Sequence, residues 1–155
     1  MDATQTAVLS GAEEITWNLA DLYAGVDDPA IERDLDSADT RADKLSETYR
    51  GHIAQLNAKE LLAAVTTYES IVEGMHKAAA FAYLLWSTNA EDAAAGALLQ
   101  KATERASRLG QKLVFFELEW ANAPDDKAQA LLSDPSLERY RHWLELARRY
   151  RPYLL

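Results

Sequence analysis

Cysteine is absent from this chain of 155 residues. Its absence excludes disulfide bonds, thiolate metal sites and a cysteine nucleophile, and it fits a reducing cytoplasm. Glycine and proline are scarce, with six and four residues. Because these two residues interrupt helices most strongly, their scarcity beside frequent alanine and leucine favours a helical protein.

Long apolar runs are also missing. No run approaches the ~18 apolar residues that a membrane-spanning helix needs. The first twelve residues contain Asp2 but no lysine or arginine, so they do not form a signal peptide. We therefore expect a soluble, cytoplasmic protein that begins with a disordered lead-in over residues 1–14.

Positive charge is in short supply, and it is unevenly placed. The formal net charge is −9; residues 1–100 carry 17 acidic and 6 basic side chains, and residues 101–155 carry 8 and 10. The acidic first part argues against binding to nucleic acid. Basic residues gather near the end of the chain, at Arg139, Arg141, Arg148, Arg149 and Arg151. A phosphate-binding strip is one interpretation; the favoured one is that these cations suit the negative C-terminal ends of helices.

What the chain does contain is helical periodicity. Asp28 followed by Pro29 predicts a helix start, and apolar residues then recur every three or four positions as far as Gly51. The segment that starts at Asn57 has the form of a capping box and predicts a second helix to about Trp86. Gly74 interrupts that helix, which indicates close packing against another helix.

A third helix is expected to begin at a cap on Asn89 and to run to about Ala121. Its second half, residues 113–120, is so rich in large apolar side chains that we expect burial on more than one side. A short helix over residues 126–132 and a last one from Asp134 to near Tyr150 complete the pattern. The sequence thus predicts an all-α fold, a bundle of long antiparallel helical hairpins with about four to five helices, after a short non-helical segment.

The sequence offers no catalytic centre. None of His52, His76 and His142 belongs to a His-Glu-x-x-His zinc motif. Glu73 and His76 have the Glu-x-x-His spacing of di-iron bundles, but such a site needs a second copy of the motif and two further glutamates. Four other glutamates could be recruited, but nothing selects them: Glu69, Glu104, Glu117 and Glu119. We therefore predict no catalytic, cofactor-binding or metal-binding residue in this chain.

Aromatic residues supply a different kind of candidate. Most of the tryptophan and phenylalanine side chains are expected in the core, namely Trp86, Phe115, Phe116, Trp120 and Trp143. Rings outside regular helix are the better candidates for a docking face. The predicted interface is therefore the opening segment, with Trp17, Leu19, Leu22 and Tyr23.

Several segments together resemble the N-terminal domain of the oligoendopeptidase F family of zinc metallopeptidases, which are thimet-oligopeptidase-like. Residues 17–23 read Trp-Asn-Leu-Ala-Asp-Leu-Tyr and are followed by Asp-Asp-Pro at 27–29; Ala20 stands where the family has serine or threonine. Residues 115–119 are similar to the family's aromatic-acidic helix. Residues 134–137, 140–141 and 148–152 are similar to the segment that closes its N-terminal domain.

The resemblance implies that residues 15–155 are a helical N-terminal domain and that the catalytic zinc domain lies beyond this chain. It implies a wall of a substrate channel that admits only short peptides. This chain would be inactive alone. Its partners would be the catalytic domain of the parent peptidase and the peptides that the whole enzyme cleaves. As an isolated domain it would self-associate. Zinc would be expected only in the missing domain, so no cofactor is expected here.

The alternative is a stand-alone helical-bundle interaction module without peptidase activity. The first hypothesis predicts an apolar face left unburied, and the second predicts a closed core.

Overall fold

A computed structural model describes residues 18–149 and 151–153, and every regular element within these ranges is helical. The five α-helices are α1 (Pro29–Tyr49), α2 (Ala58–Thr88), α3 (Ala93–Asn122), α4 (Asp125–Leu132) and α5 (Arg141–Arg149). Three short 3₁₀ helices join them or follow them, namely η1 (Ile53–Gln55), η2 (Pro135–Tyr140) and η3 (Arg151–Tyr153). The predicted all-α class is confirmed.

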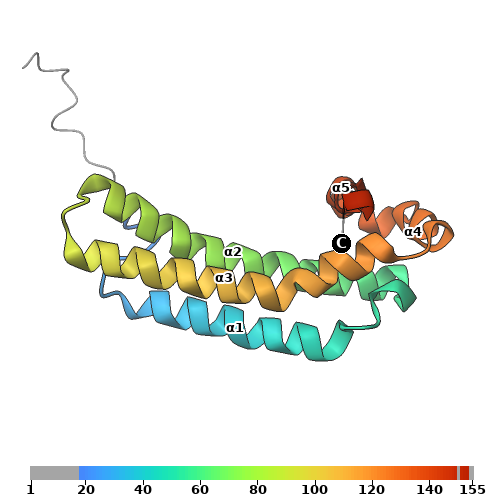
Figure 1. The fold of residues 1–155 in the computed structure, drawn as a ribbon, viewed down its shortest axis with the longest axis horizontal. Helices are drawn as coiled ribbons and strands as arrows, with labels where there is room; N and C mark the ends of the chain where they lie inside the picture. The colour runs from blue at the N-terminus through green and yellow to red at the C-terminus, as the bar shows by residue number, and fades with distance from the viewer. Residues whose placement is uncertain (1–17, 150, 154–155) are drawn as a thin grey trace, which may run out of the picture.

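The three long helices lie side by side, and successive helices run in opposite directions (Figure 1). Helix α1 contacts both α2 and α3. Helices α4 and α5 gather at one end of this three-helix bundle, where α1 finishes and α2 begins (Figure 1). None of the helices in the described ranges is long and apolar enough to cross a membrane.

The helix starts follow the capping residues in the sequence. The Asp28 side chain accepts a hydrogen bond from the Ala30 amide at 2.8 Å, and Pro29 opens α1. The predicted capping box of α2 is confirmed, since Asn57 and Glu60 each accept from the other's backbone amide at 3.0 Å. These bonds satisfy amides that lack a partner within the helix.

The predicted cap of the third helix was wrong. The side chain that caps α3 belongs to Asp92, which accepts from the amides of Ala94 and Ala95 at 2.8 and 3.3 Å. Asn89 instead ends α2, with its backbone amide bonded to the Trp86 carbonyl at 3.2 Å. Both residue types can cap a helix, so the sequence pattern alone placed the start three residues too early.

The last predicted helix is divided in two. Its first six residues form η2, and the α-helix begins only at Arg141. In a 3₁₀ helix residues three apart eclipse each other, so Leu137 and Tyr140 lie on one side, and both are buried. The tighter turn therefore brings two apolar side chains onto the bundle together.

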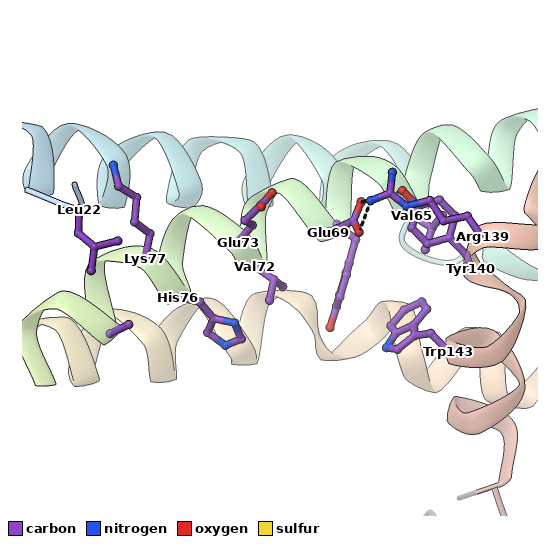
Figure 2. A pocket seen from close by; sticks show the side chains of 12 residues that line it. Leu22, Val65, Glu69, Val72, Glu73, His76, Lys77, Arg139, Tyr140 and Trp143 are labelled. Carbon is purple, nitrogen blue, oxygen red and sulfur yellow. Dashed lines mark hydrogen bonds and ion pairs between the residues drawn. The ribbon is translucent and has the colours of Figure 1, made fainter. Parts of the chain in front are cut away.

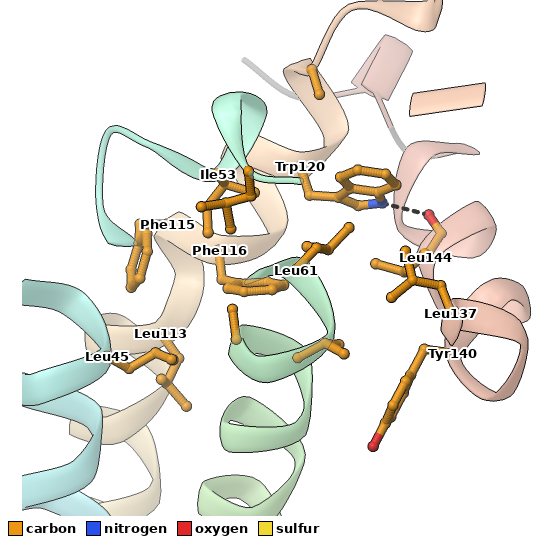
Figure 3. Packing of buried hydrophobic residues seen from close by; sticks show 14 of the residues in the cluster. Leu45, Ile53, Leu61, Leu113, Phe115, Phe116, Trp120, Leu137, Tyr140 and Leu144 are labelled. Atoms are coloured by element: carbon orange, nitrogen blue, oxygen red, sulfur yellow. Dashed lines mark hydrogen bonds between the residues drawn. The ribbon is translucent and has the colours of Figure 1, made fainter. Parts of the chain in front are cut away.

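The larger core cluster lies where α4, η2 and α5 meet the ends of the long helices (Figure 3). Trp120 and Phe116 are fully buried there, together with Leu61 and Leu144. The Trp120 Nε1 donates a hydrogen bond to the Leu144 carbonyl at 2.8 Å. A second cluster at the other end joins the opening segment to the helices and contains Tyr23, Ile31, Leu35, Phe81 and Leu98.

The crowded second half of α3 is buried on more than one side, as expected, except at two residues. Leu113, Phe115, Phe116 and Trp120 are all buried, although Phe115 lies about 140° around the helix from Trp120. Val114 and Leu118 are 49% and 37% exposed, so these two residues lie on the outward face of α3.

Gly74 does not mark a close helix contact. A Cβ atom added there would meet no other atom within 4 Å, so the packing expected from the sequence is not present. The glycine that the fold does require is Gly51, whose φ of 82° lies in the left-handed region. It makes the turn between α1 and η1.

Arg148 satisfies the C-terminal end of a neighbouring helix. Its Nη1 donates to the carbonyls of Trp120 and Ala123 at 2.8 and 3.0 Å. These carbonyls lie at the end of α3, where the last turn has no partners within the helix. The cation thus suits a negative helix end, as predicted, but the helix is α3 rather than its own.

Candidate functional site

A groove of about 730 Å³ runs along the face of α2 that looks toward η2 and α5 (Figure 2). Its floor and ends are formed by Leu22, Val65, Tyr68, Glu69, Val72, Glu73, His76, Lys77, Ala80, Arg139, Tyr140 and Trp143. The volume lies within the range of small-molecule and peptide sites. The groove is therefore the candidate functional site.

Helical spacing explains why α2 supplies the floor. Val65, Glu69, Val72 and His76 recur every three or four residues, so they share one side of the helix. The end wall comes from η2 and α5, where Arg139, Tyr140 and Trp143 project toward the groove (Figure 2).

The aromatic part of the wall is held in place by stacking and hydrogen bonds. The Tyr68 ring lies 5.3 Å from the Trp143 ring and 5.2 Å from the Phe116 ring, measured between centroids. The Tyr68 hydroxyl donates to Glu117 Oε1 at 2.6 Å. Burial raises the pKa of Tyr68, and the bond to Glu117 raises it further. Tyr68 therefore stays protonated at neutral pH and acts as a fixed donor rather than as a base.

Two ion pairs stand at opposite ends of the groove. At one end, Glu69 accepts from Arg139 Nη2 at 2.9 and 3.1 Å and from the Tyr140 hydroxyl at 2.7 Å. At the other end, Lys77 Nζ donates to Asp34 Oδ2 at 3.2 Å. Each cation thus has a carboxylate partner.

The opening segment is anchored beside the second ion pair. The Tyr23 hydroxyl donates to Asp34 Oδ2 at 2.7 Å, and Lys77 lies 4.1 Å from the centre of the Tyr23 ring. The bond from Tyr23, followed by that from Lys77, lowers the pKa of Asp34. Burial, and then the bond to Asp34, raises the pKa of Tyr23. These contacts fix Leu22 at the end of the groove.

Three of the four residues of the predicted interface lie in the described part of the chain, and they have different surroundings. Leu22 lines the groove, and Leu19 is half-buried against the second core cluster. Tyr23 is only 3% exposed, and it packs edge-on against Phe81 at 5.2 Å. Tyr23 was expected on an exposed face, and this expectation was wrong. Its ring is buried against α1 and α2 and forms part of the core of this chain. Trp17 lies outside the described residues.

The glutamates considered for a metal site have structural partners instead. Glu119 accepts from the backbone amides of Gly51 and Ile53 at 2.7 and 3.3 Å and so holds the turn after α1. Glu69 and Glu117 bond to tyrosine hydroxyls, and Glu104 accepts from Gln100 at 3.1 Å. Over residues 18–149 and 151–153, no group of three or more His, Cys, Asp or Glu side chains is placed to hold a metal ion.

Sequence reasoning missed most of the groove. Tyr68 and Val72 follow the helical spacing of the apolar residues in α2, which does not distinguish a groove from a core, and Trp143 was expected in the core. The available signal was the breadth of the apolar surface of α2, which exceeds what one neighbouring helix can cover. The pattern does not say which part stays open, because that depends on where η2 and α5 fold back.

The end wall of the groove falls within the part of the chain that is similar to known proteins. Residues 119–155 match the family model described as Oligopeptidase F, which represents the N-terminal region of M3 peptidases. No curated protein and no solved structure matches the chain. The predicted resemblance to the N-terminal domain of the oligopeptidase F family is therefore confirmed over residues 119–155, which include Arg139, Tyr140 and Trp143.

Proposed function

We propose that this chain is the N-terminal helical domain of a cytoplasmic zinc metalloendopeptidase that cleaves oligopeptides. In this role it forms one wall of the substrate channel and limits access to short peptides. The observation that carries the proposal is the position of the groove. Its end wall, formed by Arg139, Tyr140 and Trp143, belongs to the segment that matches the Oligopeptidase F model.

The rigidity of the wall supports a role in selection by shape. Tyr68 is held by Glu117 and two stacked rings, and Tyr140 is held by Glu69. Side chains fixed in this way keep their positions when a ligand enters, so they restrict what fits. A folded protein is far larger than a groove of about 730 Å³, whereas an extended peptide can lie along it.

Exposed apolar side chains support a covalently linked or docked neighbour. Val114 and Leu118 on α3 and Leu146 on α5 are each at least 37% exposed. The hypothesis of a peptidase domain predicts that some apolar surface is left uncovered. The hypothesis of an independent interaction module predicts a closed core. We assign these exposed side chains to contacts with the catalytic domain of the parent peptidase.

In this proposal zinc is bound by the catalytic domain of the parent peptidase, which is not part of this chain. The residues described here do not form a ligand set, so no step of peptide hydrolysis is assigned to them. In this proposal the domain binds and orients the peptide and excludes larger proteins from the channel.

The reading frame that encodes the chain provides a first test. It should continue beyond Leu155 and encode His-Glu-x-x-His; a stop codon directly after Leu155 would contradict the intact-enzyme form of the proposal. A second test assays the 155-residue protein on a quenched fluorescent oligopeptide with added zinc. We expect no turnover, and cleavage that a chelator abolishes would show that the chain is itself catalytic.

Photo-crosslinking in the parent peptidase tests the channel role directly. With p-benzoylphenylalanine in place of Val72, we expect a crosslink to a non-cleavable substrate peptide. The same residue in place of Ser37, which is exposed on α1, should give none. Equal labelling at both positions would argue against a wall formed by the groove.

A further inference from the structure

The length of the groove sets the size of its ligand. Its floor extends along α2 from Val65 to Ala80. At 1.5 Å per residue this distance is ~22 Å. An extended peptide rises about 3.3 Å per residue, so about six to seven residues lie along the floor.

The middle of the groove carries a carboxylate that has no partner among the described residues. Glu69, Glu73 and Lys77 follow one another at intervals of four along α2. Glu69 is paired with Arg139, and Lys77 is paired with Asp34. Within the part of the chain that the structure describes, Glu73 makes no ion pair or side-chain hydrogen bond, and it is exposed. The free charge of the groove is therefore negative, and it attracts a cation.

An apolar surface lies a short distance from this charge. The half-buried Trp143 packs against Tyr68 with the two ring planes inclined by 40°, and both residues line the groove. Tyr68 precedes Glu73 by five residues, which is ~7.5 Å along the helix and about 140° around it, so the two residues lie on different sides of the groove floor. An extended ligand can thus meet both features with side chains that are a few residues apart.

We propose that the groove binds an extended peptide of about six to seven residues with a lysine or arginine against Glu73. An apolar side chain a few residues away lies against Trp143 and Tyr68. This inference rests on the proposed function, because it names the chemistry of the peptide that the channel wall accepts. It adds a preference for positive charge at one position.

Nuclear magnetic resonance of the ¹⁵N-labelled 155-residue protein tests the proposal. The probe is the hexapeptide acetyl-Ala-Phe-Ala-Lys-Ala-Ala-amide. On titration we expect the indole N–H signal of Trp143 to shift with saturation. The indole N–H of Trp120 donates to Leu144 inside the core, so its signal should stay in place and serves as an internal control.

Charge selection is tested with a matched peptide and a matched variant. The peptide with glutamate in place of lysine should bind about 3- to 10-fold more weakly. Glu73→Gln should reduce the affinity for the lysine peptide by about the same factor. Glu47→Gln, at an exposed site of α1 outside the groove lining, should leave the affinity unchanged. Both residues are exposed, so both variants should keep the thermal midpoint of the parent.

The possible failures point to different errors. Equal binding of the two peptides, or an unchanged affinity in Glu73→Gln, would overturn the charge preference and leave the channel wall intact. A Trp143 signal that shifts with protein concentration alone would show that a second copy fills the groove, which also overturns the inference. The absence of any peptide-induced shift would overturn it as well. The reading frame beyond Leu155 decides the proposed function independently of all these results.

Discussion

At the scale of single residues, Trp120 combines complete burial with a satisfied polar atom. Its side chain is 0% exposed, and its Nε1 donates to the Leu144 carbonyl at 2.8 Å (Figure 3). The same residue therefore fills the core and ties α3 to α5. Sequence reasoning placed Trp120 in the core correctly, but no spacing pattern identifies a hydrogen-bond partner 24 residues away.

Trp120→Phe is expected to lower the free energy of unfolding by about 2–3 kcal/mol. The loss combines a smaller buried side chain with a missing hydrogen bond in a buried site. Urea denaturation at neutral pH measures it. Trp86→Phe, at a half-buried position, should cost less than about 1 kcal/mol. The Trp86 side chain is already partly in contact with water, so the substitution removes less buried apolar area. Equal costs at the two sites would contradict the importance assigned to the Trp120 bond.

Asp34 gives the protein a specific sensitivity to acid. Because the pKa of Asp34 is lowered by Tyr23 and Lys77, its contribution to stability is complete above the unfolded-state pKa of about 3.9. It is lost as the pH falls through the lower folded-state pKa. At neutral pH, Asp34→Asn should cost about 1 kcal/mol, a modest value because the side chain is 37% exposed.

The cost of Asp34→Asn should shrink on acidification, since the parent loses the same interaction when its carboxyl is protonated. Urea denaturation at a series of pH values between about 5 and 3 measures the difference. Glu47→Gln, at an exposed site of α1, should show little cost at any of them. A difference between Asp34→Asn and the parent that does not vary with pH would show that packing, rather than charge, explains the effect.

At the scale of the elements, local patterns predicted the helices well and their junctions less well. The α2 capping box depends on residues three positions apart, so the sequence contains it entirely. The start of α3 had two good capping candidates, Asn89 and Asp92, and only the path of the loop selects the second. The division between η2 and α5 follows from the burial of Leu137 and Tyr140 against distant residues, which a local pattern cannot show.

Two glycines are expected to respond oppositely to the same substitution. Gly74 lies inside α2 with open space around it, so Gly74→Ala should stabilise the protein by about 0.5–1 kcal/mol. Gly51 has a φ of 82°, and Gly51→Ala should destabilise it by about 1–2 kcal/mol. Thermal and urea unfolding of both variants measures the signs. A loss of stability in Gly74→Ala would reveal a close contact at that position after all.

At the scale of the whole molecule, the charge imbalance along the sequence becomes an interface between helices. The acidic residues of α1 face basic residues of α3: Arg105 pairs with Asp36 and Asp39, and Lys112 pairs with Asp39 and Asp43. The uneven charge was visible in the sequence. That it serves α1–α3 packing was not, because the partners lie about seventy residues apart.

The groove was harder to predict from the sequence than the bundle. Periodicity shows which side chains of α2 are apolar, and it cannot show that η2 and α5 cover only part of them. Leu22 was predicted as an interface residue from its position before the helices, and it does line the groove. Trp143 was expected in the core, and only its stacking on Tyr68 beside open space reveals a second role.

The α1–α3 charge interface leads to a test that separates local pairing from net charge. Added salt weakens individual ion pairs, but it also screens the repulsion within a protein of net charge −9. The salt dependence of the parent alone therefore mixes two opposing effects. The cost of Arg105→Gln isolates the first, since it compares two proteins in the same buffer. Because Arg105 contacts two carboxylates at 2.6 and 2.7 Å and is 19% exposed, this cost should be about 1–2 kcal/mol at low salt.

We expect the cost of Arg105→Gln to fall when sodium chloride is raised from about 0.05 to 0.5 M, where the screening length drops to a few ångströms. Urea denaturation at both salt concentrations measures it. Arg33→Gln removes the same charge from an exposed site of α1 and should cost less than about 0.5 kcal/mol at either concentration. A cost for Arg105→Gln that is independent of salt would mean that the aliphatic stem of Arg105, packed between α1 and α3, stabilises the bundle more than its charge does.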